Sequence, residues 1–291
     1  MAGRQRRDGW LLVLPALVLI VALSLYPLAY SLWLAVHRWD LQSPGTPLIW
    51  LDNFSAALRD DRMWAALRNT GLIVVVGITA EFFLGLALAL MLVDSARLKR
   101  FVLPVFILPV MMVPVVVGLA WRMLWDNQYG AINYVLREIF GQETNIIWLG
   151  RTNTAIVAMI VTQVWQWTPF MFIILLAGLS AVNPELYEAA VLDGATWWRT
   201  LIDITLPAIR HIVAVALLFR ALDAFKIFDL VYMFTQGGPG TSTETVSWYI
   251  YRLGFQFFRM GYASAISYLV LILLTVVATL YVGRFVREGQ A

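Results

Sequence analysis

Six stretches of the sequence are long and apolar enough to cross a lipid bilayer, and they leave little of the chain for anything else. A membrane-spanning helix needs about 20 predominantly apolar residues. The stretches lie at residues 10–36, 69–93, 101–125, 153–178, 207–234 and 260–283. The composition agrees, because 61% of the residues are hydrophobic and 13% are charged, whereas soluble domains average about 45–50% apolar and about 25% charged. We therefore expect an all-α integral membrane protein, a bundle of six transmembrane helices that forms one domain over residues 1–291.

Basic residues near the ends of the stretches predict the topology. One cluster precedes the first stretch at 4–7, and another lies at 97–100, between the second and third stretches. Basic residues favour the cytoplasmic side, so we expect both chain ends inside and the long loops at about 37–68, 126–152 and 235–261 outside. The charge-free run from Gly9 to Val36 is too long for a signal peptide, and no small-x-small cleavage site follows it. It is therefore expected to be an uncleaved first span.

The polar loop at 183–207, between the fourth and fifth stretches, carries its own helix signals. Asn183 suits an N-cap, Pro184 suits the first helical position, and Glu185 complements the positive helix end. This helix should run to about Leu192, and the Gly194 that follows can take a positive φ. A second short helix should begin near Thr196. Two interpretations fit this bent loop: a rigid knob for a partner protein, or an ordinary amphipathic helix on the membrane surface.

The same loop resembles the EAA loop of bacterial ABC-importer permeases. The shared pattern is Glu188-Ala189-Ala190, three residues, Gly194, nine residues, and then Ile204-x-Leu206-Pro207. The resemblance implies that the loop is a cytoplasmic coupling helix that docks on an ATP-binding subunit. The residues it assigns to this coupling are Glu188, Ala189, Ala190, Asp193, Gly194 and Pro207.

Further motifs resemble the sugar-permease branch of that family. Phe225-x-x-Phe228-Asp229 near the end of the fifth stretch is followed by Thr235-x-Gly237-Gly238-Pro239 and Tyr249-x-Tyr251 in the order typical of the branch. Pro104, Pro109, Trp121 and the run Gly130-x-Ile132-Asn133-x-x-Leu136 also match. The resemblance implies a bacterial or archaeal cytoplasmic membrane and a carbohydrate or sugar-like solute. It also implies partners: a second homologous permease subunit, two ATPase subunits that hold ATP and Mg, and an extracytoplasmic solute-binding protein.

Polar and charged side chains inside the apolar stretches are candidates for the solute path, because such groups usually face a bundle interior or a water-filled cavity. Four charges recur every third residue in the fifth stretch, where they would alternate in sign along one helix and could pair. Glu81 could contact solute or pair with a residue such as Arg122. Amides and indoles in the fourth stretch could bind a sugar or only pack. The candidates for the path are Gln163, Trp165, Trp167, Asp223, Lys226, Asp229 and Tyr232, whereas pairing explains Arg220 better than a place in the path.

Several classes of chemistry are excluded by the sequence. It has no cysteine, and neither lysine follows a glycine, so it cannot carry a Gly-Lys phosphate-binding loop. The two histidines lie far apart, at His37 and His211, which disfavours a metal site or a Ser-His-Asp triad. We expect no catalytic residue, cofactor or metal in this chain and no nucleic-acid partner. The alternative to an ATP-driven importer is a stand-alone ion-coupled secondary transporter, with Glu81 or the fifth-stretch charges as ion sites.

Overall fold

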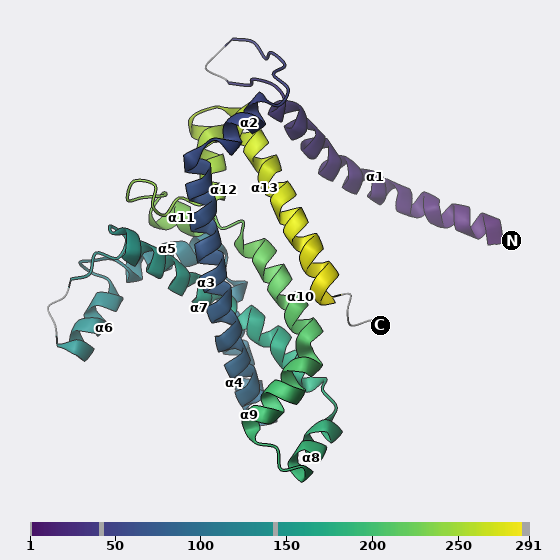
Figure 1. Ribbon diagram of the computed structural model, residues 1–291, viewed down its shortest axis with the longest axis vertical. Coiled ribbons are helices and arrows are strands. Elements are labelled where there is room, and N and C mark those ends of the chain that lie inside the picture. The colour runs from purple at the N-terminus through teal and green to yellow at the C-terminus, as the bar shows by residue number, and fades with distance from the viewer. Residues whose placement is uncertain (1, 41–43, 142–144, 287–291) are drawn as a thin grey trace. The chain divides into compact units, whose positions relative to one another are not determined.

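The computed structural model describes residues 2–40, 44–141 and 145–286, and most of these residues are helical (Figure 1). The chain divides into two compact units. Unit 1 comprises residues 1–63 and 249–273, and unit 2 comprises residues 64–248 and 274–291. The only β-type pairing in the described part of the chain is an isolated bridge between His37 and Leu48.

Five helical segments of the described residues are long and apolar enough to cross a membrane. They are Val13–Ala35, Asp61–Leu92, Thr152–Ser180, Trp197–Ala224 and Met260–Phe285. A bent pair of helices adds a sixth if the pair counts as one span. These segments agree with the expected all-α membrane fold and overlap five of the six apolar stretches of the sequence.

The third apolar stretch is a broken helix. Helix α4 (Ala96–Met111) and helix α5 (Pro114–Leu124) meet at an angle of 96°. Met112 and Val113 between them have extended backbone, with ψ values of 139° and 130°. Pro114 explains the break, because it lacks an N–H and disfavours the helical region for the residue before it. Such a pair is either a broken span or a re-entrant loop, so one span over 101–125 stays a prediction.

The fifth stretch is also interrupted, which corrects the expectation of one helix over 207–234. Helix α10 (Leu206–Ala224) ends in a tight turn, in which the N–H groups of Lys226 and Ile227 donate to the carbonyls of Asp223 and Ala224. Helix α11 (Asp229–Phe234) then begins anew. The charges therefore do not form a ladder on one helix: Lys226 lies in the break and Asp229 in the first turn of α11, where a carboxylate complements the helix dipole.

Unit 1 contains helix α1 (Ala2–Ala35), helix α2 (Asp52–Leu58), the π-helical turn η2 (Arg252–Gln256) and most of helix α13 (Met260–Tyr281). The Asn53 side chain donates to the carbonyls of Ala35 and His37 at 2.8 and 3.0 Å, which ties α2 to the end of α1. The N–H of Gly261 donates to the carbonyl of Trp39 at 3.1 Å. These bonds hold the loop after α1 against the start of α13.

The core of unit 2 lies between helix α3 (Asp61–Leu92), helix α7 (Thr152–Ser180) and α10. Apolar side chains from all three helices form one buried cluster that includes Ile78, Leu86, Phe172, Leu175 and Ile209. A Cβ added at Gly85 would lie 2.9 Å from the Phe172 nitrogen, so this glycine permits close approach of α3 and α7. Small residues at helix contacts are typical of membrane proteins.

Six short elements complete the described chain. They are α6 (Ala131–Phe140), α8 (Pro184–Leu192), α9 (Trp197–Arg199), the π-helical turn η1 (Thr200–Thr205), α12 (Val246–Tyr251) and the π-helical turn η3 (Val282–Val286). In unit 2, α8 and α9 lie beyond the ends of α7 and α10, away from α5, α6 and α11 (Figure 1). The elbow of residues 183–207 therefore occupies one end of unit 2.

Candidate functional site

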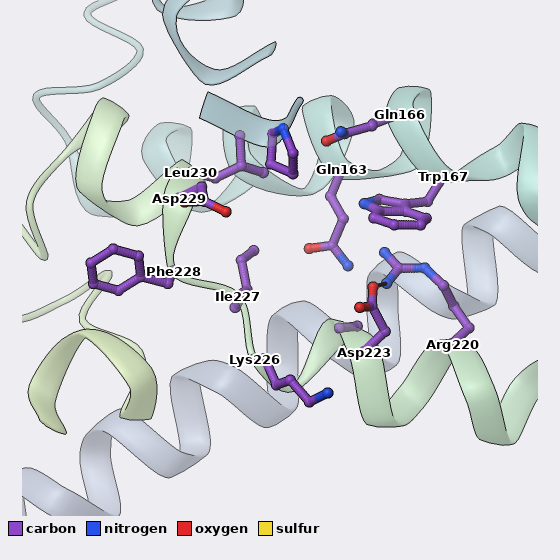
Figure 2. Close-up of a pocket in the computed structure, with 12 residues that line it drawn as sticks. Gln163, Gln166, Trp167, Arg220, Asp223, Lys226, Ile227, Phe228, Asp229 and Leu230 are labelled. Atoms are coloured by element: carbon purple, nitrogen blue, oxygen red, sulfur yellow. Dashed lines mark hydrogen bonds and ion pairs between the residues drawn. The ribbon is translucent and has the colours of Figure 1, made fainter. Parts of the chain in front are cut away.

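A polar cavity of about 210 Å³ opens in unit 2 between α7, the end of α10 and the start of α11 (Figure 2). It brings together five of the seven candidate path residues, although they come from three separate segments. The lining residues are Pro114, Gln163, Gln166, Trp167, Arg220, Asp223, Ala224, Lys226, Ile227, Phe228, Asp229 and Leu230. The break after Ala224 creates this arrangement, because it turns Lys226 and Asp229 toward the same space as Asp223.

A buried ion pair lies beside the cavity and joins α3 to α10. Arg220 Nε donates to Glu81 Oε2 at 2.7 Å, and a terminal nitrogen of Arg220 donates to Glu81 Oε1 at 2.9 Å. The side chains are 1% and 0% exposed. The expectation that Arg122 could be the partner of Glu81 is wrong: Arg122 instead donates to the carbonyl of Met233 at 2.9 Å. Two-point pairing of a guanidinium with a carboxylate is among the strongest polar contacts in proteins.

Arg220 is held on two further sides. Its remaining terminal nitrogen donates to Asp223 Oδ2 at 3.0 Å, and its guanidinium carbon lies 4.5 Å from the centre of the Trp167 ring. The Asp223 side chain is 51% exposed, unlike Arg220. Asp223 thus receives one bond from the buried arginine and keeps a carboxylate oxygen for the cavity.

The Gln163 amide points toward Arg220 and Asp223 in Figure 2. The side chain is buried, and neither its oxygen nor its nitrogen has a hydrogen-bond partner within the described residues. Buried polar groups are usually bonded, and exceptions often mark a place for water or ligand. Asp229 lies at the other side of the cavity and the Lys226 side chain at its lower edge in this view. The site therefore offers carboxylate and amide oxygens together with one ammonium group.

Two candidate path residues lie outside the cavity lining. The Trp165 ring is 40% exposed and packs edge to face on Trp121, with 5.4 Å between ring centres. Tyr232 stacks on Phe228 at 5.8 Å and contacts Trp248 at 5.7 Å. Trp165 is two residues from both Gln163 and Trp167, so its side chain lies on another face of α7 than theirs.

The elbow at 183–207 has the local geometry that its sequence predicted. The Asn183 side chain accepts from the N–H of Glu185 at 3.1 Å and caps α8, which ends at Leu192. Gly194 has a φ of +69°, and Thr196 is the N-cap of α9. A bend with positive φ strongly favours glycine, because other residues are strained there.

The residues assigned to coupling are mostly on the surface of the elbow. Glu188, Ala189, Asp193, Gly194 and Pro207 are exposed. Ala190 is 5% exposed, and its carbonyl accepts from the N–H of Ala195 at 2.9 Å, so it packs within the elbow instead of facing outward. The turn η1 precedes Pro207, and there the N–H of Leu206 donates to the carbonyl of Leu201, five residues back. Because Pro207 has no N–H, the helix cannot continue its regular bonding through this point.

Large apolar side chains surround the coupling residues and were not predicted as part of the site. Val191 is 76% exposed, Leu192 is 88% exposed, and Trp197 and Trp198 are 58% and 66% exposed. A cleft of about 1390 Å³ lies between the elbow and the ends of α3 and α7. The adjacent pair Trp197-Trp198 close to Gly194 was the available signal, since contiguous exposed apolar side chains mark interaction surfaces.

Within the described residues, no group of three or more His, Asp or Glu side chains could hold a metal ion. The polar cavity and the elbow are the two candidate sites of this chain. Neither contains a nucleophile paired with a histidine base.

Comparison with known proteins identifies the family. The model of the family described as "Binding-protein-dependent transport system inner membrane component" matches residues 81–288. The trehalose/maltose transport system permease protein MalF of Thermococcus litoralis is 35% identical over 290 residues, covering 98% of this chain and 96% of that protein. The trehalose transport system permease protein SugA of Mycobacterium tuberculosis is 38% identical over 282 residues, covering 97% and 89%.

A solved structure of an ABC transporter subunit has the same fold. A chain from a bacterial ABC transporter involved in the import of the acidic polysaccharide alginate is 25% identical, has a TM-score of 0.83, and matches with 98% of both chains covered. The all-α membrane fold and the resemblance to ABC-importer permeases are thereby confirmed. This chain belongs to the family of binding-protein-dependent transport system inner membrane components.

Proposed function

We propose that this chain is the membrane-spanning permease subunit of an ATP-driven importer that carries a saccharide into the cell. The relatives named above are permeases of trehalose or trehalose/maltose transport systems, and they match the chain over nearly its full length. The family description ties such subunits to a solute-binding protein. A second permease subunit and two ATP-hydrolysing subunits would complete the machine, with ATP and Mg bound in those partners.

The exposed elbow is the observation that carries this proposal. Its two short helices meet at Gly194 and present Val191, Leu192, Trp197 and Trp198 to the outside. Such apolar exposure on a rigid bend is typical of a protein–protein contact. We place the elbow on the cytoplasmic side, where an ATPase subunit would grip it. The acidic residues Glu188 and Asp193 would then form the polar rim of the contact.

The cavity in unit 2 is the proposed solute path. Asp223, Asp229 and Gln163 supply oxygens that accept hydrogen bonds from sugar hydroxyls, and Lys226 supplies a donor. The cavity lies at the two interrupted helices, α4–α5 and α10–α11. Broken helices commonly line substrate sites in membrane transporters, because backbone groups freed at the break face a cavity.

Transport then follows as a mechanical switch between two packed states. Closure of the ATPase subunits on ATP would move the elbows and shift the permease from an inward-open to an outward-open arrangement. The η1 turn and Pro207 join the elbow directly to α10, whose other end lines the cavity. A push on the elbow would therefore be transmitted along α10 to Arg220 and Asp223.

A first experiment tests the coupling role of the elbow. Gly194→Pro should abolish transport and the stimulation of ATP hydrolysis by solute-loaded binding protein, because proline cannot take a φ of +69°. Glu188→Arg, which reverses a charge on the proposed contact, should do the same while both variants still insert in the membrane. The measurement is ATP hydrolysis and solute uptake by the complete importer in proteoliposomes.

Gly141→Pro is the matched control for Gly194→Pro. Gly141 also ends a short helix with a positive φ of +60°, but it lies after α6, away from the elbow. Its replacement should leave coupling intact. Normal coupled transport by Gly194→Pro and Glu188→Arg would contradict the docking role, and transport by the purified chain alone down an ion gradient would favour a secondary transporter.

A second experiment tests the side of the membrane. The chain has no cysteine, so Val191→Cys and Tyr129→Cys each create a single thiol in an otherwise thiol-free protein. Both parent side chains are highly exposed, at 76% and 91%. A membrane-impermeant maleimide applied to intact cells should label the cysteine at position 129 and spare the one at position 191. Labelling at position 191 in intact cells would overturn the proposed orientation.

A further inference from the structure

The ionic groups at the cavity carry a net negative charge. Two cations and two anions line the cavity, namely Arg220, Lys226, Asp223 and Asp229. Glu81 is bonded to Arg220 and adds a third negative charge, so the five groups sum to −1. The cluster therefore has no excess positive charge, although it contains an arginine and a lysine.

The one buried cation is satisfied by the protein itself. Each of the three guanidinium nitrogens of Arg220 donates to a carboxylate oxygen, two to Glu81 and one to Asp223. One face of the guanidinium lies against Trp167. Because only 1% of its side chain is exposed, Arg220 has no free pair of N–H donors that could bind a carboxylate or sulfonate on a solute.

We propose that Glu81 and Asp223 determine the charge class of the solute: by holding Arg220, they make the cavity select an uncharged saccharide against an anionic one. The carboxylate oxygens of Asp223 and Asp229 accept hydroxyl donors and repel an acidic sugar. This inference rests on the proposed function and goes one step further, because a saccharide importer can also serve acidic sugars, as the alginate importer does.

Direct binding to the purified importer, without its binding protein, tests the selectivity of the cavity separately from that of the binding protein. The probes are trehalose and a disaccharide of two uronic acids, and saturation-transfer NMR in lipid nanodiscs detects each one. The unmodified importer should bind trehalose in preference to the uronate by about tenfold or more, since like-charge juxtaposition in a binding site is strongly unfavourable.

Two variants should shift this preference toward the uronate. Asp223→Ala removes an exposed side chain, frees one nitrogen of Arg220 for the cavity and raises the net charge from −1 to 0. Glu81→Gln raises it equally and releases one nitrogen, because glutamine keeps a single acceptor oxygen. The matched control is the double variant Glu81→Gln/Arg220→Gln, which keeps the net charge at −1 and should keep the preference for trehalose.

Each outcome decides the inference. Equal or tighter binding of the uronate by the unmodified importer would overturn it, as would an unchanged preference in Asp223→Ala, which does not depend on the folding of Glu81→Gln. A preference that also shifts in the double control would assign the effect to lost packing and overturn the charge argument. Failure of the proposed function is distinguishable, because the importer would then bind neither saccharide.

Discussion

Glu81 in unit 2 and Asp60 in unit 1 are both acidic residues with several bonds, but their partners are of opposite kinds. Glu81 is fully buried and meets a single cation, Arg220, at 2.7 and 2.9 Å. Asp60 is partly buried at the start of α3 and accepts from neutral donors. The hydroxyls of Tyr249 and Tyr262 donate to its Oδ2 at 2.6 and 2.7 Å, and the N–H of Arg62 donates to its Oδ1 at 2.9 Å.

The comparison shows at which of the two sites the charge itself is required for stability. In a buried ion pair, removing one member leaves the other without compensation, which typically costs about 3–5 kcal/mol, whereas removing both can be nearly neutral. A carboxylate held by hydroxyl and amide donors loses these bonds one at a time, at about 1–3 kcal/mol each. Stability should therefore fall in one large step when one member of the Glu81–Arg220 pair is replaced. It should fall in smaller steps when the donors to Asp60 are removed one at a time.

The largest expected effect is that of Glu81→Gln on stability. This change leaves the guanidinium of Arg220 buried with only Asp223 as its anionic partner, and we expect a loss of about 3–5 kcal/mol in the free energy of unfolding. Unfolding of the purified importer in mixed micelles of increasing SDS content would measure it. The double variant Glu81→Gln/Arg220→Gln should recover most of the loss, and a double variant as unstable as the single one would contradict the view that an uncompensated arginine causes it.

Asp60→Asn should have an intermediate effect. Asparagine keeps one acceptor oxygen but loses the charge, so the bonds from Tyr249 and Tyr262 weaken, and the helix dipole at the start of α3 loses its anion. We expect a loss of about 1.5–3 kcal/mol, measured by the same unfolding experiment. A loss as large as that of Glu81→Gln would erase the distinction between the two sites.

Tyr249→Phe tests one step of the Asp60 cluster. The ring of Tyr249 is 5% exposed, and Arg62 lies 5.3 Å from its centre, contacts that phenylalanine retains. Only the bond to Asp60 is lost, and we expect a cost of about 1–2 kcal/mol in the free energy of unfolding. Tyr129→Phe, at a position 91% exposed, is the control and should change nothing. No effect of Tyr249→Phe would mean that the bonds from Tyr262 and from the N–H groups of Arg62 and Met63 suffice to hold Asp60.

The sequence predicted the apolar helices well, because length and apolar content are local properties. It located the elbow for the same reason: Asn183, Gly194 and Pro207 each act through their own backbone geometry. The interruption at 225–228 was missed, since no proline or glycine marks it and charges three apart are equally consistent with a continuous helix. The break at Met112 and Val113 was also missed. Pro114 explains it, but the continuous apolar stretch 101–125 was interpreted as one span.

Which charged residues pair with each other was harder to predict than which residues line the cavity. Five of seven candidate residues do line it, because polar groups in apolar stretches gather where they escape lipid. The pairing of Glu81 with Arg220 spans 139 residues, however, and Arg122 was an equally eligible cation by sequence. Only the packing of α3 on α7 and α10 decides between them.

The smallest expected effect is the pH dependence contributed by Asp60. Burial alone would raise the pKa of this carboxyl, but the hydrogen bonds from Tyr249, Tyr262 and the N–H groups of Arg62 and Met63 outweigh it, so the pKa of Asp60 lies below its ordinary value of 3.8. Burial and the bond to Asp60 also raise the pKa of Tyr249, which keeps it a donor.

Because the pKa of Asp60 is lower in the folded chain than in the unfolded chain, its stabilising contribution is complete above the unfolded pKa and disappears as the pH falls through the folded one. The free energy of unfolding should therefore decrease more steeply below about pH 4 in the unmodified protein than in Asp60→Asn. Unfolding measured from pH 7 to pH 3 in both proteins gives this difference. Parallel curves would mean that the hydroxyl donors hold the protonated and ionised carboxyl equally well, and Asp60 would then serve unit 1 by geometry instead of charge.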